Sequence, residues 1–109
     1  MTNVNYDQFK AMEFKVGEIK EVEEIPGADK IYKIKVDIGE ERTVVAGIKV
    51  FYTMEELVGK KVAVLVNLEP KTLRGVESHG MLLAAVVDDP RKVTLLTLDR
   101  DMPNGTRIS

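Results

Sequence analysis

Strict alternation of apolar and polar residues over residues 32–38 is the feature that most restricts how this chain can fold. The apolar members share one parity: Tyr32, Ile34, Val36 and Ile38. The polar members share the other: Lys33, Lys35 and Asp37. Successive side chains of a β-strand point to opposite faces, so this spacing predicts a strand with one buried face and one solvated face. The two lysines either widen a basic binding surface, together with Lys30 in the preceding turn, or simply solvate the sheet.

Other segments predict the partners of this strand. An extended run over residues 14–25 ends at Pro26-Gly27, and residues 43–46 read as the strand that returns after a turn at Gly39. Two apolar runs, residues 62–68 and 81–87, are rich in β-branched and small side chains and predict central strands buried on both sides. A last strand is expected over residues 93–98.

Two short helices are expected. The N-terminal one is capped by Asn5 with Gln8 three residues later, and Phe9 and Met12 would face inward. The second lies over residues 53–59, where Thr53 and Glu56 form a capping box and Gly59 suits the left-handed position after the last turn.

Five or six short strands with a helix between the third and fourth predict an all-β fold. A sheet of such short strands must close to protect its edges. The order and length fit a five-stranded barrel of the oligonucleotide/oligosaccharide-binding (OB) fold, with a short helix between strands 3 and 4 and another at the N-terminus. The 109 residues contain no repeat and no linker, so we expect a single domain over residues 1–109.

Composition excludes several classes of function. The absence of cysteine rules out disulfides and, with one histidine, argues against zinc; no other metal or cofactor motif occurs. No signal peptide or membrane-spanning apolar run is present, so we expect a cytoplasmic protein without a membrane partner. The net charge of −2 restricts any nucleic-acid site to a local patch. No catalytic pattern is found, since adjacent Ser78 and His79 would point apart on an extended segment.

The most unusual segment is the polar, glycine-containing stretch over residues 67–81, between two predicted buried strands. We expect a loop of about 12 residues, and long loops on small barrels are common sites of function. Lys71 and Arg74 supply positive charge that can contact phosphates, and Ser78 adds a neutral donor. Asn67, at the end of the preceding strand, can recognise a base edge or a 2′-hydroxyl.

A less specific interpretation of the same segment stays open at this point. Glu69 and Glu77 can pair with Lys71 and Arg74 and make an ordinary solvated surface loop. Residue types alone do not decide between this alternative and a binding site.

The sequence resembles the tRNA-binding domain family of OB-fold modules over about residues 6–108. The residues that carry the resemblance are Phe14-Lys-Val-Gly-Glu-Ile19, Pro26-Gly-Ala-Asp-Lys30-Ile-Tyr32, Val36-Asp-Ile-Gly39, Arg42-Thr-Val-Val-Ala-Gly47-Ile, Glu56-Leu-Val-Gly-Lys60, Asn67-Leu-Glu-Pro and Leu73-Arg-Gly-Val-Glu-Ser78-His-Gly-Met81-Leu-Leu-Ala-Ala85. Members of the family stand alone as structure-specific tRNA-binding proteins, or are joined to methionyl-tRNA, tyrosyl-tRNA and phenylalanyl-tRNA synthetases.

The resemblance implies that the motif Lys-x-Arg-Gly-x-x-Ser-x-Gly-Met contacts the outside corner of tRNA. The implied tRNA-binding residues are Asn67, Lys71, Arg74, Ser78 and Met81. Lys71 is one place early, because Thr72 occupies the basic position of the motif, and His79 replaces a common glutamine. Met81, judged by its own position, is expected to pack under the loop. Aromatic residues make up only 6% of the chain, which favours recognition of folded RNA over stacking on single strands.

The resemblance also implies partners. Relatives form homodimers through the N-terminal segment and the strands after the binding loop, and they serve an aminoacyl-tRNA synthetase, here most simply the methionyl enzyme. A chaperone-like branch of the family is the alternative, although that branch departs from the Arg-Gly-x-x-Ser-x-Gly-Met pattern that this chain keeps. The chain can also be one domain of a longer synthetase.

Overall fold

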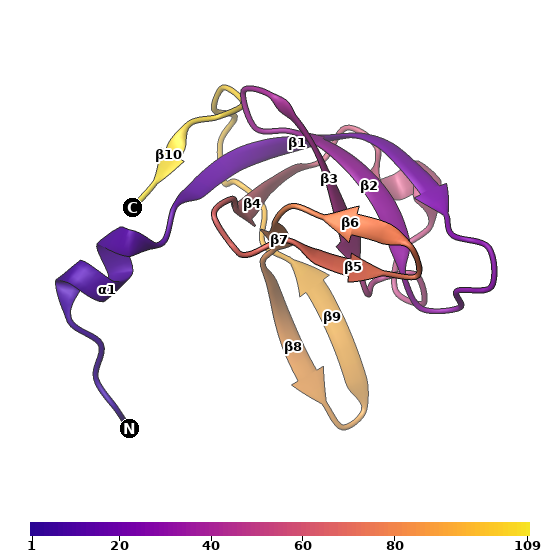
Figure 1. The fold of residues 1–109 in the computed structure, drawn as a ribbon, viewed down its shortest axis with the longest axis horizontal. Coiled ribbons are helices and arrows are strands. Elements are labelled where there is room, and N and C mark those ends of the chain that lie inside the picture. The colour runs from indigo at the N-terminus through magenta and orange to yellow at the C-terminus, as the bar shows by residue number, and fades with distance from the viewer.

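A single long strand, β1, is shared by both halves of the main sheet (Figure 1). The computed structural model describes residues 1–109. The strands of this sheet are β1 (Phe14–Glu24), β2 (Tyr32–Asp37), β3 (Glu41–Ala46), β4 (Lys61–Leu65), β7 (Met81–Leu82) and β10 (Arg107–Ile108). They follow the order β3-β2-β1-β4-β7, and β10 pairs with the start of β1. The first part of β1 pairs with β4 and the second part with β2, all antiparallel.

The alternating strand behaves as its sequence predicts. Its four apolar side chains are buried, and they join a core contributed mainly by β1, β2, β3 and β4. Tyr32 is buried as expected, and its hydroxyl donates a hydrogen bond to the Tyr52 carbonyl oxygen (2.8 Å). The sheet curls around this core into a nearly closed barrel of five strands, which confirms the predicted all-β, OB-like fold.

Gly17 lies where β1 passes from β4 to β2. A Cβ atom at this position would be 2.6 Å from Val36 Cγ2 and 2.9 Å from Val64 Cγ2. Contacts this short do not occur between real side chains, and the atoms involved belong to stiff β-branched residues in the core. Glycine at this position therefore lets the two halves of the sheet close on each other.

We expect Gly17→Ala to lower the free energy of unfolding by about 1–3 kcal/mol, because the added methyl group overpacks the core. Gly47→Ala is the matched control, since a Cβ there meets nothing closer than the Lys30 carbonyl oxygen at 4.0 Å. Urea denaturation of the two variants measures the difference. Equal stability of Gly17→Ala and Gly47→Ala would contradict the role assigned to Gly17.

Both predicted helices are present with their capping boxes. Helix α2 (Met54–Leu57) is capped by Thr53 and Glu56, and Leu57 is fully buried between the strands. Helix α1 (Tyr6–Ala11) is capped by Asn5 and Gln8. No helix in the chain has the length and apolar character needed to cross a membrane.

The expectation that Phe9 and Met12 face inward is wrong. The two side chains are 38% and 47% exposed, and α1 has no buried residue. The helix extends to one side of the barrel (Figure 1), where the Phe14 ring stacks on Phe9 at a centroid distance of 6.1 Å. The barrel of the same chain therefore leaves the apolar face of this helix uncovered.

The expectation of a buried central strand over residues 81–87 is also wrong, because none of these residues is buried. Only β7 joins the barrel, and β8 (Ala84–Asp88) pairs with β9 (Arg91–Leu95) in a hairpin that projects from it (Figure 1). Val86 and Val87 are half-exposed on this hairpin. The apolar run therefore predicts a strand correctly but does not predict whether that strand is buried.

Asn104 fastens the C-terminal segment to the middle of the sheet. Its side-chain amide donates to Glu18 Oε1 and to Asp37 Oδ2, both at 3.1 Å. The Asn104 hydrogen bond is the main reason that the pKa of Glu18 lies below its ordinary value. The pKa of Asp37 is lowered first by the Gly39 backbone N–H and then by Asn104. Both carboxylates are thereby kept as acceptors for this segment.

Candidate functional site

The segment over residues 67–81 contains a β-hairpin, where a loop was expected. Strands β5 (Lys71–Leu73) and β6 (Val76–Ser78) pair in register and are joined by Arg74 and Gly75 alone. These two residues have φ values of 52° and 79°. Positive φ at both central positions is the signature of a type I′ turn, which suits the twist of a hairpin. Arg74 is the one non-glycine residue of the chain with positive φ, and it stands at the tip.

The cations of this hairpin are free of acidic partners. Arg74 and Lys71 are exposed, and no carboxylate oxygen lies within 4.0 Å of either. Glu77 instead contacts His79, with Oε1 2.9 Å from Nε2, and Glu69 forms no ion pair. The alternative in which the acidic residues of the segment neutralise its two cations is therefore wrong.

Elsewhere many basic side chains are already paired. On the solvated face of the main sheet, Lys33 lies 3.8 Å from a Glu23 carboxylate oxygen and Lys35 lies 3.5 Å from that of Glu21. These pairs join residues directly opposite each other on β1 and β2. The β2 lysines therefore solvate the sheet and add little free positive charge.

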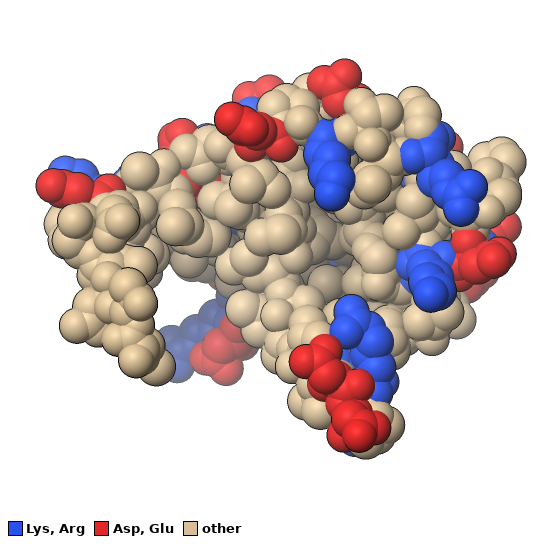
Figure 2. Space-filling model, turned by 60° about the horizontal axis from the view of Figure 1, so that its bottom comes forward, with Lys and Arg blue, Asp and Glu red and all other residues tan.

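Charge is unevenly spread over the side of the molecule that carries the projecting hairpin. Figure 2 shows basic side chains in separate spots around an uncharged surface, while acidic side chains gather at the end of the β8–β9 hairpin. The basic residues of the whole chain that lack an ion pair are Lys10, Lys15, Lys30, Lys60, Lys71, Arg74, Lys92 and Arg107. Local unpaired cations thus exist on a chain whose net charge is −2.

Ser78 closes the barrel. Its side chain is buried, and its Oγ accepts a hydrogen bond from the Val45 N–H (2.9 Å) and donates one to the Gly80 carbonyl oxygen (3.2 Å). The neighbouring His79 N–H donates to the Thr43 carbonyl oxygen (2.8 Å). These bonds join β6 to the free edge of β3, so the Ser78 hydroxyl is occupied within the protein.

Arg42 strengthens the same closure and was not singled out from the sequence as a structural residue. Its Nη1 donates to the Val66 carbonyl oxygen at 2.6 Å and to that of His79 at 3.4 Å. An arginine near the start of a strand looks like an ordinary surface charge. Its role in closing the barrel becomes visible only in the topology, which brings the start of β3 close to the end of β4.

Asn67 and Met81 occupy different settings. The Asn67 side chain accepts from the Glu13 N–H (2.9 Å) and donates to the Ala11 carbonyl oxygen (2.7 Å), so it fastens the segment that follows α1 to the end of β4. Met81, which we expected to pack under the loop, is 44% exposed on β7. Lys71 and Arg74 are therefore exposed, whereas the side chains of Asn67 and Ser78 are hydrogen-bonded within the protein.

Ser78→Ala is expected to lower the free energy of unfolding by about 1–3 kcal/mol, because it leaves the Val45 N–H without its acceptor. Thr72→Ala, on the exposed side of the same hairpin, is the control and should change stability little. Thermal unfolding followed by circular dichroism measures both. If Ser78→Ala were as stable as Thr72→Ala, the hydroxyl would not be needed for closure.

The structure thus combines a nearly closed, OB-like barrel with a cationic hairpin tip. Residues 14–107 match the family model described as "Putative tRNA binding domain", so the chain belongs to the tRNA-binding domain family. The sequence resemblance and the family model agree over nearly the whole chain.

Known relatives include methionine–tRNA ligases, a MetRS-related protein and a chaperone. The chain is 50% identical over 109 residues to a methionine–tRNA ligase of Thermococcus kodakarensis, covering 99% of this chain and 14% of that protein. It therefore spans about a seventh of the length of such relatives. A MetRS-related protein from Pyrococcus horikoshii is 43% identical, with a TM-score of 0.93 and full coverage of both chains. The chaperone CsaA of Bacillus anthracis is 28% identical, with a TM-score of 0.89 over 99% of this chain and 100% of that one.

Proposed function

We propose that this chain is a non-catalytic module that holds folded tRNA by its outside corner in the cytoplasm. It serves an aminoacyl-tRNA synthetase, the methionyl enzyme first, as an accessory protein or as an auxiliary subunit or domain. The similarity to methionine–tRNA ligases and to a MetRS-related protein supports the choice of partner enzyme.

The observation that carries the proposal is that Arg74 is exposed and unpaired at the hairpin tip. A guanidinium at a hairpin tip, exposed and without a carboxylate partner, is available to contact a phosphate through two parallel hydrogen bonds. Its backbone has positive φ, a conformation that asparagine or glycine would adopt more readily. The turn does not require an arginine at this position, so the side chain is free to act outside folding.

Arg74→Asn separates binding from folding. Because Asn-Gly is a preferred type I′ pair, the variant should be at least as stable as the parent protein. It should nevertheless bind folded tRNA more weakly, and the slope of log affinity against log salt should fall by roughly 0.7–0.9, the value for one lost phosphate contact. Filter binding across a series of salt concentrations measures both quantities.

Arg100→Asn is the matched control, because Arg100 is also exposed but lies beside Asp99, at 3.7 Å between Nε and Oδ2. This variant has the same change in net charge and should bind almost normally. Equal losses in the two variants would mean that only overall charge matters. Equal affinity of the parent protein for folded tRNA and for unfolded single strands would overturn recognition of tRNA shape.

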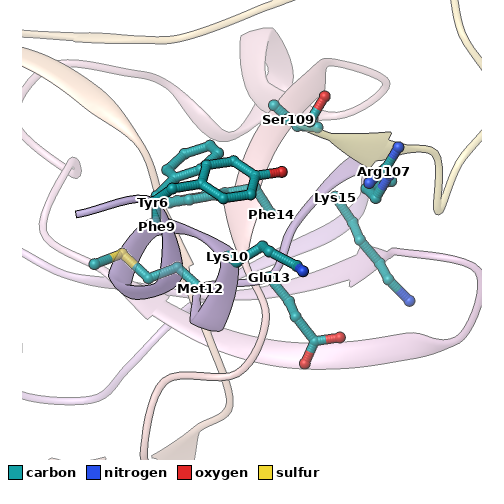
Figure 3. Close-up of a pocket in the computed structure, with 10 residues that line it drawn as sticks. Tyr6, Phe9, Lys10, Met12, Glu13, Phe14, Lys15, Arg107 and Ser109 are labelled. Atoms are coloured by element: carbon teal, nitrogen blue, oxygen red, sulfur yellow. The ribbon is translucent and has the colours of Figure 1, made fainter.

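The proposal includes a homodimer. Two elements project from the barrel with exposed apolar side chains, α1 and the β8–β9 hairpin (Figure 1). A cavity of about 300 Å³ lies between α1, β1 and β10. Figure 3 shows Tyr6, Phe9 and Phe14 at one end of it and Lys15 and Arg107 at the other. A second copy is the occupant that the family resemblance implies for these surfaces.

Val87→Glu should weaken the dimer, because it places a charge in the apolar surface of the β8–β9 hairpin. Val87 is 54% exposed, so the monomer itself should remain stable. Val58→Glu, at a residue 53% exposed at the end of α2, is the control and should leave assembly unchanged. Sedimentation equilibrium gives the molar masses, and a parent protein that stays monomeric at every concentration would contradict the dimer.

A second candidate is a chaperone that binds unfolded protein. The same exposed apolar side chains favour it, as does the likeness to the chaperone CsaA. It predicts tight binding to a denatured protein that does not change with salt, whereas tRNA binding weakens steeply as salt rises. A competition experiment with folded tRNA and a denatured client distinguishes the two functions.

A further inference from the structure

A small pocket lies between the tip of the β5–β6 hairpin and the connection from β1 to β2. Its volume is about 270 Å³, and its lining residues are Ala28, Asp29, Lys30, Ile31 and Arg74. Pockets for drug-sized molecules occupy roughly 300–1,000 Å³, so this one suits a smaller unit. Arg74 is the only member contributed by the hairpin; the other four come from the connection.

Three charged residues line this pocket, and none of them forms an ion pair. Lys30 and Arg74 have no carboxylate oxygen within 4.0 Å, and Asp29 has no basic nitrogen within that distance. All three are exposed. The pocket therefore combines two unpaired cations with one unpaired carboxylate. A site for a simple anion would need the cations but not the carboxylate.

Hydrogen bonds to neighbouring segments hold the backbone on both sides of the pocket, the β1–β2 connection and the β5–β6 hairpin. On the β1–β2 side, the Lys49 N–H donates to the Lys30 carbonyl oxygen (3.2 Å), and Lys49 Nζ donates to that of Ala28 (3.1 Å). On the hairpin side, the Ser78 hydroxyl and the His79 N–H hold the base of β6 against β3. The backbone positions of the residues that line the pocket are therefore set before any ligand arrives, which lowers the entropy lost on binding.

We infer that this pocket seats one ribose–phosphate unit of the tRNA backbone. Arg74 and Lys30 contact the phosphate, and the Asp29 carboxylate accepts a hydrogen bond from the 2′-hydroxyl. A phosphate needs the cations, and a hydroxyl donor next to it explains the carboxylate. The 2′-hydroxyl distinguishes RNA from DNA, so Asp29 determines specificity for RNA. This inference rests on the proposed tRNA-binding function.

The effect of Asp29→Ala on binding to folded tRNA has opposite signs under the two explanations. If Asp29 is only a negative charge near a polyanion, its removal tightens binding. If it accepts the 2′-hydroxyl, Asp29→Ala weakens binding by roughly three- to tenfold, the equivalent of one lost hydrogen bond. Asp29→Asn, which keeps an acceptor oxygen, should retain more affinity than Asp29→Ala.

Lys30→Gln tests the other wall, and Lys35→Gln is its control, since Lys35 already faces Glu21. Lys30→Gln should weaken binding by roughly three- to tenfold and Lys35→Gln should have little effect. Because Lys30 and Arg74 hold one phosphate, the loss in Lys30→Gln/Arg74→Asn should differ from the product of the single losses.

The possible failures can be told apart. The inferred ribose–phosphate site would be wrong if Asp29→Ala bound tRNA as well as or better than the parent protein, or if Lys30→Gln lost no more affinity than Lys35→Gln. In either case weaker binding by Arg74→Asn would still support the proposed function. If the parent protein did not bind folded tRNA, or if Arg74→Asn bound normally, the proposed function itself would fail.

Discussion

The close approach of β2 and β4 to the backbone of Gly17 is the contact on which the rest of the structure depends. One strand serves both halves of the sheet, and it can do so only where its backbone carries no side chain against Val36 and Val64. The curl of the sheet around the buried faces of β1 and β2 follows from this contact. Barrel closure then brings the edge of β3 to the β5–β6 hairpin, which carries Lys71, Arg74 and Ser78.

Some residues of the motif around the hairpin stabilise the fold, and others remain available for a ligand. Ser78 and Asn67 direct their polar atoms to backbone groups of the same chain. Arg74 and Lys71 remain exposed and unpaired. A residue pattern characteristic of a binding family therefore includes scaffold positions, and substitution of those positions would change binding through the fold.

The sequence predicted those elements that depend on neighbouring residues in the chain. The alternation over residues 32–38 gave the buried face of β2, and the pairs Asn5–Gln8 and Thr53–Glu56 gave both helix starts. The hairpin was missed because Arg74-Gly75 lacks the usual Asn-Gly signal of a type I′ turn. The exposed faces of α1 and of the β8–β9 hairpin were predicted to be buried, because an apolar pattern alone does not distinguish a buried face from an exposed one. The Lys30–Arg74 pocket joins residues 44 positions apart and depends on barrel closure.

The Asn67 amide has a thermodynamic consequence. It joins the segment that leaves α1 to the segment that enters β5, so the surface proposed for self-association and the hairpin share one fastening point. Linkage makes any coupling through this point reciprocal: if the proposed assembly raised the affinity for RNA, RNA would favour assembly to the same degree. An RNA affinity independent of protein concentration across the dimerisation range would show the two events to be uncoupled.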